Sequence, residues 1–345
     1  MKEVNVNWFQ KEIDSPERNW RFIENQGHLL KFLLNRYQWY YYPRISKVCD
    51  FPLHVDIEVS AVCDLSCPMC MRRHTDTSEY DHMDFKLFKK VVDECAENRL
   101  FSVRLSWRGE VLAHPQFADF ARYIKVKKKI PNVSFLTNGN RLSEELAEEI
   151  VDIGIDYISF SVDGIGEIYD KIRAPLKFED LYNAIFTLKR IRDEKGMKKP
   201  QIRITGLWPA IAQNPGMYFE KMTKVADKIV SNPVKDYRVT EEMKFHKDYL
   251  CQFPWERLFI AFDGRVQPCS TTVEGLYIGD VKKQSLLEIW KGSEIGKLRN
   301  AQLEGRSNEY LACCKCSYKV DVNYDDQLKM DWTDWDPSVL AERVS

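Results

Sequence analysis

The chain has 345 residues, and its 51 lysines and arginines nearly balance 52 aspartates and glutamates, which gives a formal net charge of −1. This length suits one large barrel with smaller additions, and the near-neutral charge gives no basic surface that would make nucleic acid an expected partner. The sequence shows neither the long apolar run of a membrane span nor the apolar core of an N-terminal signal peptide.

Residues 1–50 are expected to form an N-terminal extension with one aromatic-rich helix. The segment from His28 to Tyr37 has the apolar periodicity of a helix with a broad hydrophobic face, and the aromatic run from Trp39 to Tyr42 follows it. Such a helix can lie on a membrane surface. The commoner arrangement is a helix packed against the open side of a barrel, so we expect packing without membrane contact.

Between residues 51 and 245, short β-rich segments alternate with helical ones. The β-rich segments are 53–60, 101–107, 132–137, 156–161, 200–206 and about 236–240, and the helical patterns between them are 85–98, 116–128, 143–153, 178–195 and 217–231. This alternation is typical of parallel βαβ units, so the chain is expected to be an α/β protein. A barrel and an open doubly wound sheet share this pattern, and in both of them ligands bind at the carboxyl ends of the strands.

The ten cysteines lie mainly in two clusters, which is typical of metal sites in a reducing, cytoplasmic compartment. In the first cluster, Cys63, Cys67 and Cys70 follow the first expected strand with the spacing C-x3-C-x2-C. Three thiolates on one loop can bind three irons of a four-iron cluster and leave the fourth iron open to a substrate. His74 offers a fourth ligand, so a zinc site with three cysteines and one histidine is an alternative.

This triplet resembles the signature of the radical S-adenosylmethionine (SAM) enzymes. The resemblance implies a partial (β/α)6 TIM-like barrel over residues 51–245, and SAM bound to the open iron of a 4Fe-4S cluster. It also implies reductive cleavage of SAM to a 5′-deoxyadenosyl radical, with an external one-electron reductant such as flavodoxin or ferredoxin as a partner. Met69 departs from the family, in which the residue before the third cysteine is usually aromatic, but a soft apolar side chain is acceptable near the adenine.

Residues at the ends of later strands also match SAM-binding positions of the family. The segment from Trp107 to Glu110 resembles the family's Gly-Gly-Glu motif, with Arg108 in place of the first glycine. The resemblance implies that Glu110 accepts hydrogen bonds from the SAM ammonium group. The other matching SAM-binding residues are Asn138, Ser161, Arg173, Thr205 and Gly206. Taken one at a time, these are common residues at strand ends and helix surfaces.

The second cysteine cluster lies in the C-terminal part of the chain. Cys251 and Cys269 flank a strand pattern that turns at Asp263-Gly264, which is typical of a β-hairpin, and Cys313 to Cys316 follow later. This order resembles the twitch domain, a short form of the SPASM domain that some radical SAM enzymes carry.

The resemblance to a twitch domain implies a small α+β unit over residues 246–322, followed by a C-terminal tail over 323–345. It further implies that a second, fully ligated 4Fe-4S cluster binds to Cys251, Cys269, Cys313 and Cys316. Cys314 stands next to Cys313, so it is an alternative ligand in place of Cys313 or Cys316. A structural zinc site is the alternative.

Two clusters favour an oxidation, because a fully ligated cluster can accept an electron from a substrate radical. The cysteine spacing most resembles that of the butirosin-pathway aminocyclitol dehydrogenase. This implies a dehydrogenase that converts a secondary alcohol of a sugar, nucleotide sugar or cyclitol, a small-molecule substrate, to a ketone. Arg238, near the sixth expected strand, is the candidate catalytic residue.

Other functions fit the same sequence. Modification of a ribosomal peptide is the main alternative, although the segment before the first strand is shorter than the peptide-recognition domain that such enzymes often carry. A non-catalytic iron–sulfur or zinc protein is a further alternative, but such a protein has no need of Glu110, Ser161 and Arg173 at its strand ends. The sequence makes no prediction of the oligomeric state.

Overall fold

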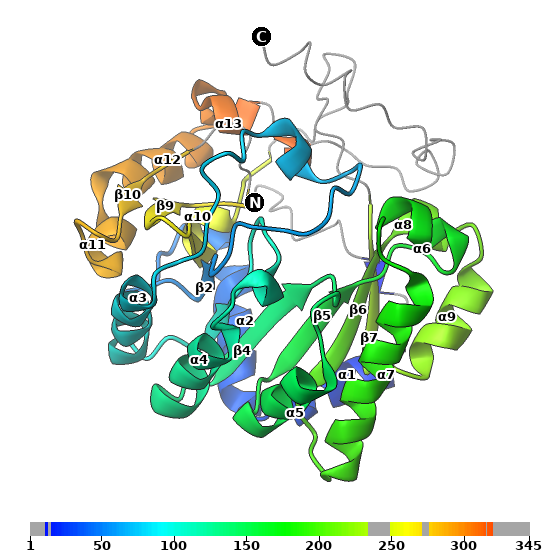
Figure 1. The fold of residues 1–345 in the computed structure, drawn as a ribbon. Coiled ribbons are helices and arrows are strands. Elements are labelled where there is room, and N and C mark those ends of the chain that lie inside the picture. The colour runs from blue at the N-terminus through cyan, green and yellow to red at the C-terminus, as the bar shows by residue number, and fades with distance from the viewer. Residues whose placement is uncertain (1–10, 13–14, 234–248, 271–275, 315, 320–345) are drawn as a thin grey trace.

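The computed structural model describes residues 11–12, 15–233, 249–270, 276–314 and 316–319. Within these residues the strands form a single sheet in the order β1-β7-β6-β5-β4-β3-β2-β8-β9-β10 (Figure 1). The strands are β1 (Lys11–Glu12), β2 (His54–Ile57), β3 (Ser102–Arg104), β4 (Asn132–Thr137), β5 (Tyr157–Ser161), β6 (Gln201–Leu207), β7 (Lys228–Asn232), β8 (Arg257–Ile260), β9 (Arg265–Gln267) and β10 (Gly279–Asp280).

The helices between the strands begin at residues suited to helix N-termini. Asp84 accepts hydrogen bonds from the first backbone N–H groups of α3, and Ser143 does the same for α5. The helices are α1 (Pro16–Asn25), α2 (Leu29–Tyr41), α3 (Phe85–Glu97), α4 (Phe117–Arg122), α5 (Glu144–Ile153), α6 (Glu167–Ile172), α7 (Phe178–Glu194), α8 (Trp208–Ile211), α9 (Pro215–Thr223), α10 (Phe253–Glu256), α11 (Leu286–Lys291), α12 (Ser293–Leu303) and α13 (Leu311–Cys314).

Strands β2 to β7 pair in parallel, each with the next along the chain, which confirms the predicted partial (β/α)6 barrel. The sixth strand of the sheet comes earlier than predicted: β7 begins at Lys228, within the predicted helix 217–231, which ends at Thr223 in α9. The predicted strand 236–240 lies outside the described residues. Ile229 and Val230 continue the apolar spacing of that helix. Their β-branched side chains suit a strand better, and they pair with β6.

The two faces of the sheet differ in chemistry, because successive side chains of a strand point to opposite faces. Val55 of β2 and Val103 of β3 point outward and are fully buried in the hydrophobic core, together with residues of α3 and α4. The alternate residues of the same strands, which include His54, Asp56 and Arg104, lie on the concave face. The concave face is therefore polar here, whereas the interior of a closed barrel is filled with branched apolar side chains.

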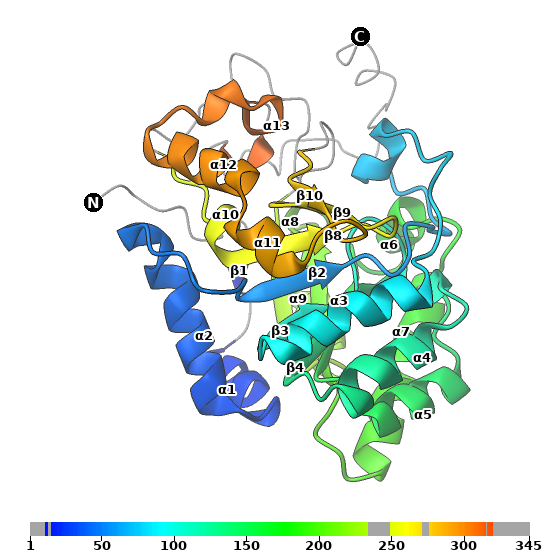
Figure 2. The ribbon, with the colours of Figure 1, turned by 90° about the vertical axis from the view of Figure 1, so that its left-hand side faces the viewer.

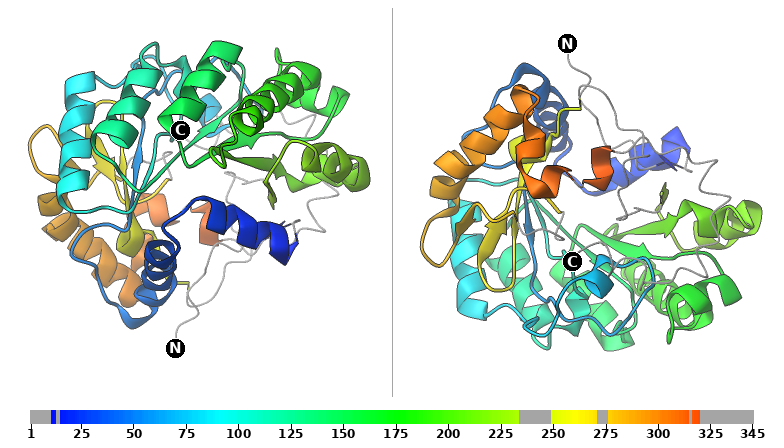
Figure 3. Two further views of the ribbon diagram at one scale, coloured as in Figure 1. Left: turned by 90° about the horizontal axis from the view of Figure 1, so that it is seen from below. Right: turned by 90° about the horizontal axis from the view of Figure 1, so that it is seen from above.

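Helices α1 and α2 lie across the concave side of the sheet, while α3, α4, α5 and α7 cover its outer face (Figure 3). Phe22 of α1 packs edge-on against Tyr157 of β5, with ring centroids 5.6 Å apart. Trp39 of α2 packs against His54 of β2 at 6.0 Å. The predicted packing of the aromatic helix against the open side of the barrel is thus confirmed. Within the described ranges, no helix combines the length and the apolar character that a membrane crossing requires.

The predicted C-terminal hairpin is present, and it joins the barrel sheet. β8 pairs in parallel with β2, and β9 and β10 continue the sheet in antiparallel fashion (Figure 2). Gly264 in the hairpin turn has a φ of +92°, a backbone conformation that glycine adopts without strain. The sheet therefore runs without a break from the part predicted as barrel into the part predicted as twitch domain. The C-terminal cysteines are held beside β2, whose carboxyl end leads to Cys63.

Candidate functional site

The triplet Cys63, Cys67 and Cys70 lies on a tight loop at the carboxyl end of β2. The backbone N–H of Cys70 donates to the carbonyl of Cys67 at 3.0 Å, and that of Arg73 donates to the carbonyl of Cys70 at 3.1 Å. Cys67 is buried, while Cys63 and Cys70 are partly exposed. A loop wound in this way presents three sulfurs from one short segment, as a cluster with one open iron requires.

The surroundings of Cys63 and Cys67 favour the protonated form of these two thiols. Burial raises the pKa of Cys63 to about 11. Burial also raises the pKa of Cys67, although the guanidinium of Arg173 lies 3.6 Å from its sulfur and opposes that rise. Cluster ligation needs thiolates, so loading the site must release protons. Arg173 supplies positive charge where the thiolates would form.

Glu110 is buried just beyond β3 and has three hydrogen-bond donors. The hydroxyl of Thr137 donates to one of its oxygens at 2.6 Å, and the backbone N–H groups of Leu112 and Asn138 donate at 3.0 and 2.7 Å. Burial raises the pKa of Glu110 to about 7 despite these donors. A carboxylate held in this way is ready to receive a cationic ligand, because pairing with a cation would offset its burial.

The motif around Glu110 is pressed against the cysteine loop. A Cβ atom at Gly109 would lie 2.4 Å from the carbonyl oxygen of Ser60 and 2.5 Å from a backbone carbon of Ala61. Only glycine fits such a close approach of two backbones. Glu110 itself donates its backbone N–H to the carbonyl of Val62 at 2.8 Å. The strand end and the cysteine loop are therefore fixed relative to one another.

Arg108, the residue that replaces a glycine of the family motif, pairs with the buried Glu58 at the end of β2. Its Nε donates to Glu58 at 2.8 Å, and a terminal nitrogen makes a second, very short contact with the same carboxylate. Glu58 also accepts the backbone N–H of Phe262 at 3.3 Å. The substitution therefore gains a structural role: it ties the Glu110 motif to the C-terminal hairpin.

The remaining predicted SAM residues converge on the same end of the sheet. Asn138 donates through Nδ2 to Asp64 of the cysteine loop at 2.9 Å. Arg173 donates to Asp163 beyond β5 at 2.7 Å, and Asp163 in turn accepts the backbone N–H of Leu207 at 2.8 Å. Two acidic residues thus connect the cysteine loop with the ends of β4, β5 and β6.

Ser161, Thr205 and Gly206 lie next to one another across β5 and β6, where Ser161 pairs directly with Thr205. A Cβ atom at Gly206 would lie 2.3 Å from the carbonyl oxygen of Val162, so this position also requires glycine. Met69 packs against a small apolar cluster formed with Ala210 of α8. Three predicted SAM-binding residues are thus neighbours at the ends of β5 and β6, and Met69 packs against α8, which follows β6.

Four of the five C-terminal cysteines line one pocket. The residues around it come from the loop before β8, the segment after β9, and α12 and α13: Tyr249, Cys251, Phe253, Pro254, Pro268, Cys269, Leu276, Leu298, Gln302, Ala312, Cys313, Cys316 and Lys319. Burial and the neighbouring thiols raise the pKa of Cys251 well above its ordinary value. Four thiols around one mainly apolar pocket suit a fully ligated iron–sulfur cluster.

The placement of Cys313 and Cys314 addresses a choice that the sequence left open. Cys313 lines the pocket, and Gln302 donates to its sulfur at 3.6 Å. Cys314 is exposed and does not belong to the residues that line the pocket. The arrangement therefore favours Cys313 and Cys316 as the last two ligands.

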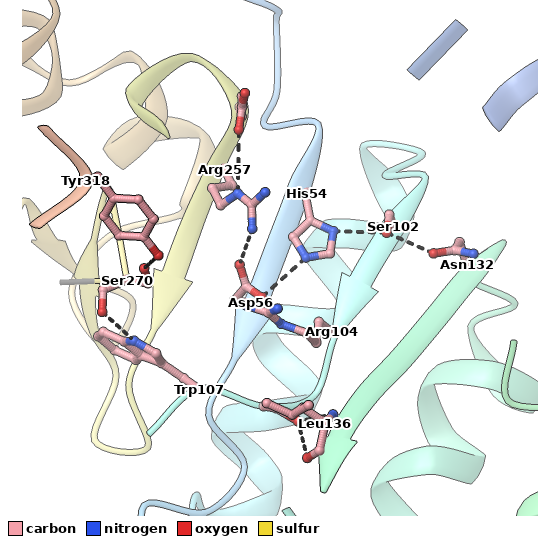
Figure 4. Close-up of polar contacts among 12 residues, drawn as sticks. His54, Asp56, Ser102, Arg104, Trp107, Asn132, Leu136, Arg257, Ser270 and Tyr318 are labelled. Atoms are coloured by element: carbon pink, nitrogen blue, oxygen red, sulfur yellow. Dashed lines mark hydrogen bonds and ion pairs between the residues drawn. The ribbon is translucent and has the colours of Figure 1, made fainter. Parts of the chain in front are cut away.

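Trp107 connects the two sites. Its indole N–H donates to the carbonyl of Ser270 at 3.3 Å, directly after Cys269, and its ring lies 5.4 Å from Phe259 of β8 (Figure 4). Trp107 lies three residues before Glu110. The concave space above β2 and β3 therefore has the predicted SAM residues at one side and the C-terminal pocket at the other.

Sequence reasoning missed three acidic residues that hold this site together: Glu58, Asp64 and Asp163. Each stands at or just after the carboxyl end of a strand, and this position is the signal that could have found them. Arg238, the predicted catalytic residue, lies outside the described residues. His114 is buried and bonded on both ring nitrogens, to the carbonyl of Met83 and the N–H of Gln116, which suits a structural role.

Family models match both parts of the chain. Residues 57–197 match the model of the radical SAM superfamily. Residues 251–317 match the model of the SPASM iron–sulfur cluster-binding domain. These matches favour iron–sulfur ligation over the zinc alternatives, with SAM as the ligand of the first site.

Two curated relatives illustrate the range of the superfamily. The tungsten-containing aldehyde ferredoxin oxidoreductase cofactor-modifying protein of Pyrococcus furiosus is 24% identical over 341 residues, which cover 82% of this chain and 92% of the relative. The mycofactocin maturase MftC of Mycobacterium tuberculosis is 25% identical over 140 residues, 40% of this chain and 35% of that protein.

Solved structures share the fold at low sequence identity. BtrN in complex with AdoMet and 2-DOIA superimposes with a TM-score of 0.53 at 17% identity, covering 77% of this chain and 92% of BtrN. The enzyme anSMEcpe with AdoMet and the Cp18Cys peptide gives 0.58 at 14% identity, covering 84% and 98%. With both family models matched in order along one continuous sheet, the chain is an enzyme that combines a radical SAM domain with a SPASM-type iron–sulfur domain after its partial barrel.

Proposed function

We propose that the protein is a dehydrogenase that oxidises a secondary alcohol of a sugar, nucleotide sugar or cyclitol to a ketone. The observation that carries this proposal is the pocket lined by Cys251, Cys269, Cys313 and Cys316, beside the concave face. Four thiolates leave no iron open to a substrate, so a cluster held there would exchange electrons. An electron acceptor near the substrate favours oxidation over isomerisation.

Oxidation of the alcohol to a ketone removes one hydrogen atom, one proton and one electron, and each of them needs an acceptor. The carbon–hydrogen bond gives its hydrogen atom to the 5′-deoxyadenosyl radical that SAM and the first cluster supply when bound. The hydroxyl group gives its proton to a base, and a cluster held by Cys251, Cys269, Cys313 and Cys316 would supply the acceptor for the remaining electron, which leaves a carbon–oxygen double bond.

The chain's own residues have separate tasks in this proposal. Cys63, Cys67 and Cys70 hold the first cluster, and Glu110 orients SAM through its ammonium group. Arg173 stabilises thiolate charge at Cys67, from which it lies 3.6 Å away. Arg238 remains the proposed catalytic residue.

A substrate screen tests the function. Reconstituted enzyme with SAM and a reductant is incubated with sugars, cyclitols and nucleotide sugars, and we expect 5′-deoxyadenosine together with a substrate product that is about two mass units lighter, the mass of two hydrogens. A Cys251→Ala, Cys269→Ala double variant should still form 5′-deoxyadenosine but accumulate no ketone. Ketone formation at the wild-type rate by this variant would contradict the proposed electron acceptor.

Peptide modification is the second candidate. It is supported by the fold shared with anSMEcpe, whose structure contains a peptide, and by the relative named a mycofactocin maturase. Peptides therefore belong in the same screen. A mass change on a peptide, with none on any sugar or cyclitol, would favour this candidate over the dehydrogenase.

A further inference from the structure

Arg104 of β3 lies on the concave face and remains partly open to solvent. Its neighbours Val103 and Leu105 point outward into the core and are fully buried. The side chain of Arg104 keeps 32% of its surface exposed, although its partner Asp56 is completely buried. A guanidinium that points into an interior space and stays accessible is available to a ligand.

Asp56 anchors this guanidinium. Nε of Arg104 lies 2.6 Å from Oδ1 of Asp56, and a terminal nitrogen of Arg257 lies 3.4 Å from Oδ2 of the same carboxylate (Figure 4). The ring of His54 contacts Asp56 at 3.3 Å and its other nitrogen contacts Ser102 at 2.9 Å. The anchor is built from β2, β3 and β8, so the position of Arg104 is fixed before any ligand arrives.

The cluster around Asp56 carries excess positive charge. Two guanidiniums, of Arg104 and Arg257, face one carboxylate. Burial lowers the pKa of His54 to about 4, so its ring is neutral near pH 7. Glu256, which lies 3.7 Å from Arg257, is also buried, and burial raises its pKa to about 8, so it is mostly protonated at that pH. Among the described residues, the carboxylate of Asp56 therefore contacts two guanidiniums, so positive charge exceeds negative charge around it.

The cluster lies close to the segments that carry the two cysteine sites. Arg104 is three residues before Trp107 on the same chain segment, and Trp107 contacts the loop that carries Cys269. The hydroxyl of Ser270 on that loop lies 3.2 Å from the hydroxyl of Tyr318, two residues after Cys316 (Figure 4). Helices α1 and α2 contact the first residues of β5 and β2 through Phe22 and Trp39. Arg104 is the last residue of β3, so it lies toward the strand ends that lead to the cysteine loop.

We propose that Arg104 is an anion subsite that binds a phosphate or carboxylate group of the substrate. The terminal nitrogens of a guanidinium carry N–H donors that match two oxygens of such a group, and the side chain of Arg104 keeps 32% of its surface exposed although its anchor Asp56 is completely buried. This inference rests on the proposed function and narrows it: the substrate is an anionic polyol, such as a sugar phosphate, a nucleotide sugar or a sugar acid, in preference to a neutral cyclitol.

Binding of simple probes tests the subsite without turnover. Inorganic pyrophosphate, malonate and neutral myo-inositol are titrated by calorimetry into reconstituted, SAM-bound enzyme. We expect at least one of the two anions to bind. Tighter binding of pyrophosphate would indicate a phosphate site, and tighter binding of malonate would indicate a carboxylate site. Arg104→Gln should weaken that binding about 10- to 100-fold, since a hydrogen bond to a charged group contributes about 1.5–3 kcal/mol.

Two further variants serve as controls for the binding experiment. Arg104→Lys keeps the charge beside Asp56 but lacks the planar fork, so its affinity should fall between wild type and Arg104→Gln. Arg122→Gln removes an exposed arginine that pairs with Glu149 on the outer face, and it should bind the probes like wild type. Iron content and SAM affinity show that each variant is folded.

Several outcomes would overturn the subsite. One is that wild type binds neither anion. Another is that Arg104→Gln binds the anions as tightly as wild type does. A third is that Arg122→Gln loses as much affinity as Arg104→Gln. If binding depends on Arg104 but no alcohol is oxidised, the dehydrogenase proposal fails and the subsite stands. If a neutral cyclitol is oxidised equally well by wild type and Arg104→Gln, the subsite fails and the dehydrogenase stands.

Discussion

The two cysteine sites of this protein are built by opposite means. The first takes its three cysteines from one loop between Cys63 and Cys70, and strand ends far apart in the sequence surround that loop with Glu110, Asn138 and Arg173. The second collects its cysteines from three segments around a mainly apolar pocket. A site that must bind a polar cosubstrate needs polar neighbours. A site that only exchanges electrons needs a ligand for every iron and an apolar pocket around the cluster.

Removing the first site should have the largest effect. Wild type should bind about eight irons as two four-iron clusters, and the variant with Cys63, Cys67 and Cys70 all changed to alanine should bind about four and form no 5′-deoxyadenosine, because SAM then has no iron to bind. Iron analysis and chromatography measure both quantities. SAM cleavage by this variant would contradict the assignment of the loop.

The adjacent pair Cys313 and Cys314 offers a matched test of the second site. Cys313→Ala should lower the iron content by up to about four per chain and still form 5′-deoxyadenosine, because the first site is intact. Cys314→Ala should retain all of its iron, since this cysteine is exposed and lies outside the pocket lining. The reverse pattern, with loss of iron only in Cys314→Ala, would exchange the two residues as ligands.

Glu110 should make SAM binding depend on pH, and no comparable dependence is expected of electron exchange at the second site. Burial raises its pKa to about 7, so the fraction ionised rises about tenfold between pH 6 and pH 8. The SAM ammonium requires the ionised form, so the affinity should rise by a similar factor as the pH increases over this range. Calorimetry at both pH values measures it.

Glu110→Gln is the control, because glutamine has a similar shape and does not titrate. It should bind SAM weakly and with little change between pH 6 and pH 8. A wild-type affinity that falls as the pH rises through 7 would exclude Glu110 as the receiving carboxylate.

The sequence predicted the elements whose signal is local. The spacing of Cys63, Cys67 and Cys70 and the hairpin turn at Gly264 each lie within a few residues, and both family models cover them. The alternation of strands and helices also predicted the parallel sheet. It failed at the sixth strand, because Ile229 and Val230 fit both periodicities and only pairing with β6 decides between them.

Contacts between distant segments could not be predicted in the same way. Arg108 looked like a simple departure from a glycine motif, and its partner Glu58 lies 50 residues away on another strand. The charge cluster of Asp56, Arg104 and Arg257 joins three strands, and its residues have no common motif. Such contacts depend on register across the sheet, which a sequence pattern along one strand does not contain.

The smallest expected effect concerns the reduction potential of the second cluster, where Gln302 offers a donor to the sulfur of Cys313 at 3.6 Å. Such hydrogen bonds stabilise the more negative, reduced state. Gln302→Leu should therefore lower the midpoint potential, and a hydrogen bond of about 1 kcal/mol corresponds to roughly 40 mV for a one-electron couple. A redox titration monitored by EPR measures the shift.

The first cluster provides the internal reference in the same titration, because Gln302 belongs to the second pocket and its replacement should leave that potential unchanged. Gln302→Glu is a useful companion variant, since a carboxylate of similar shape adds negative charge and should lower the potential further than leucine does. An unchanged potential in both variants would show that Gln302 does not act on the cluster. A shift confined to the second cluster would instead establish that its pocket sets its reduction potential independently of the SAM-binding cluster.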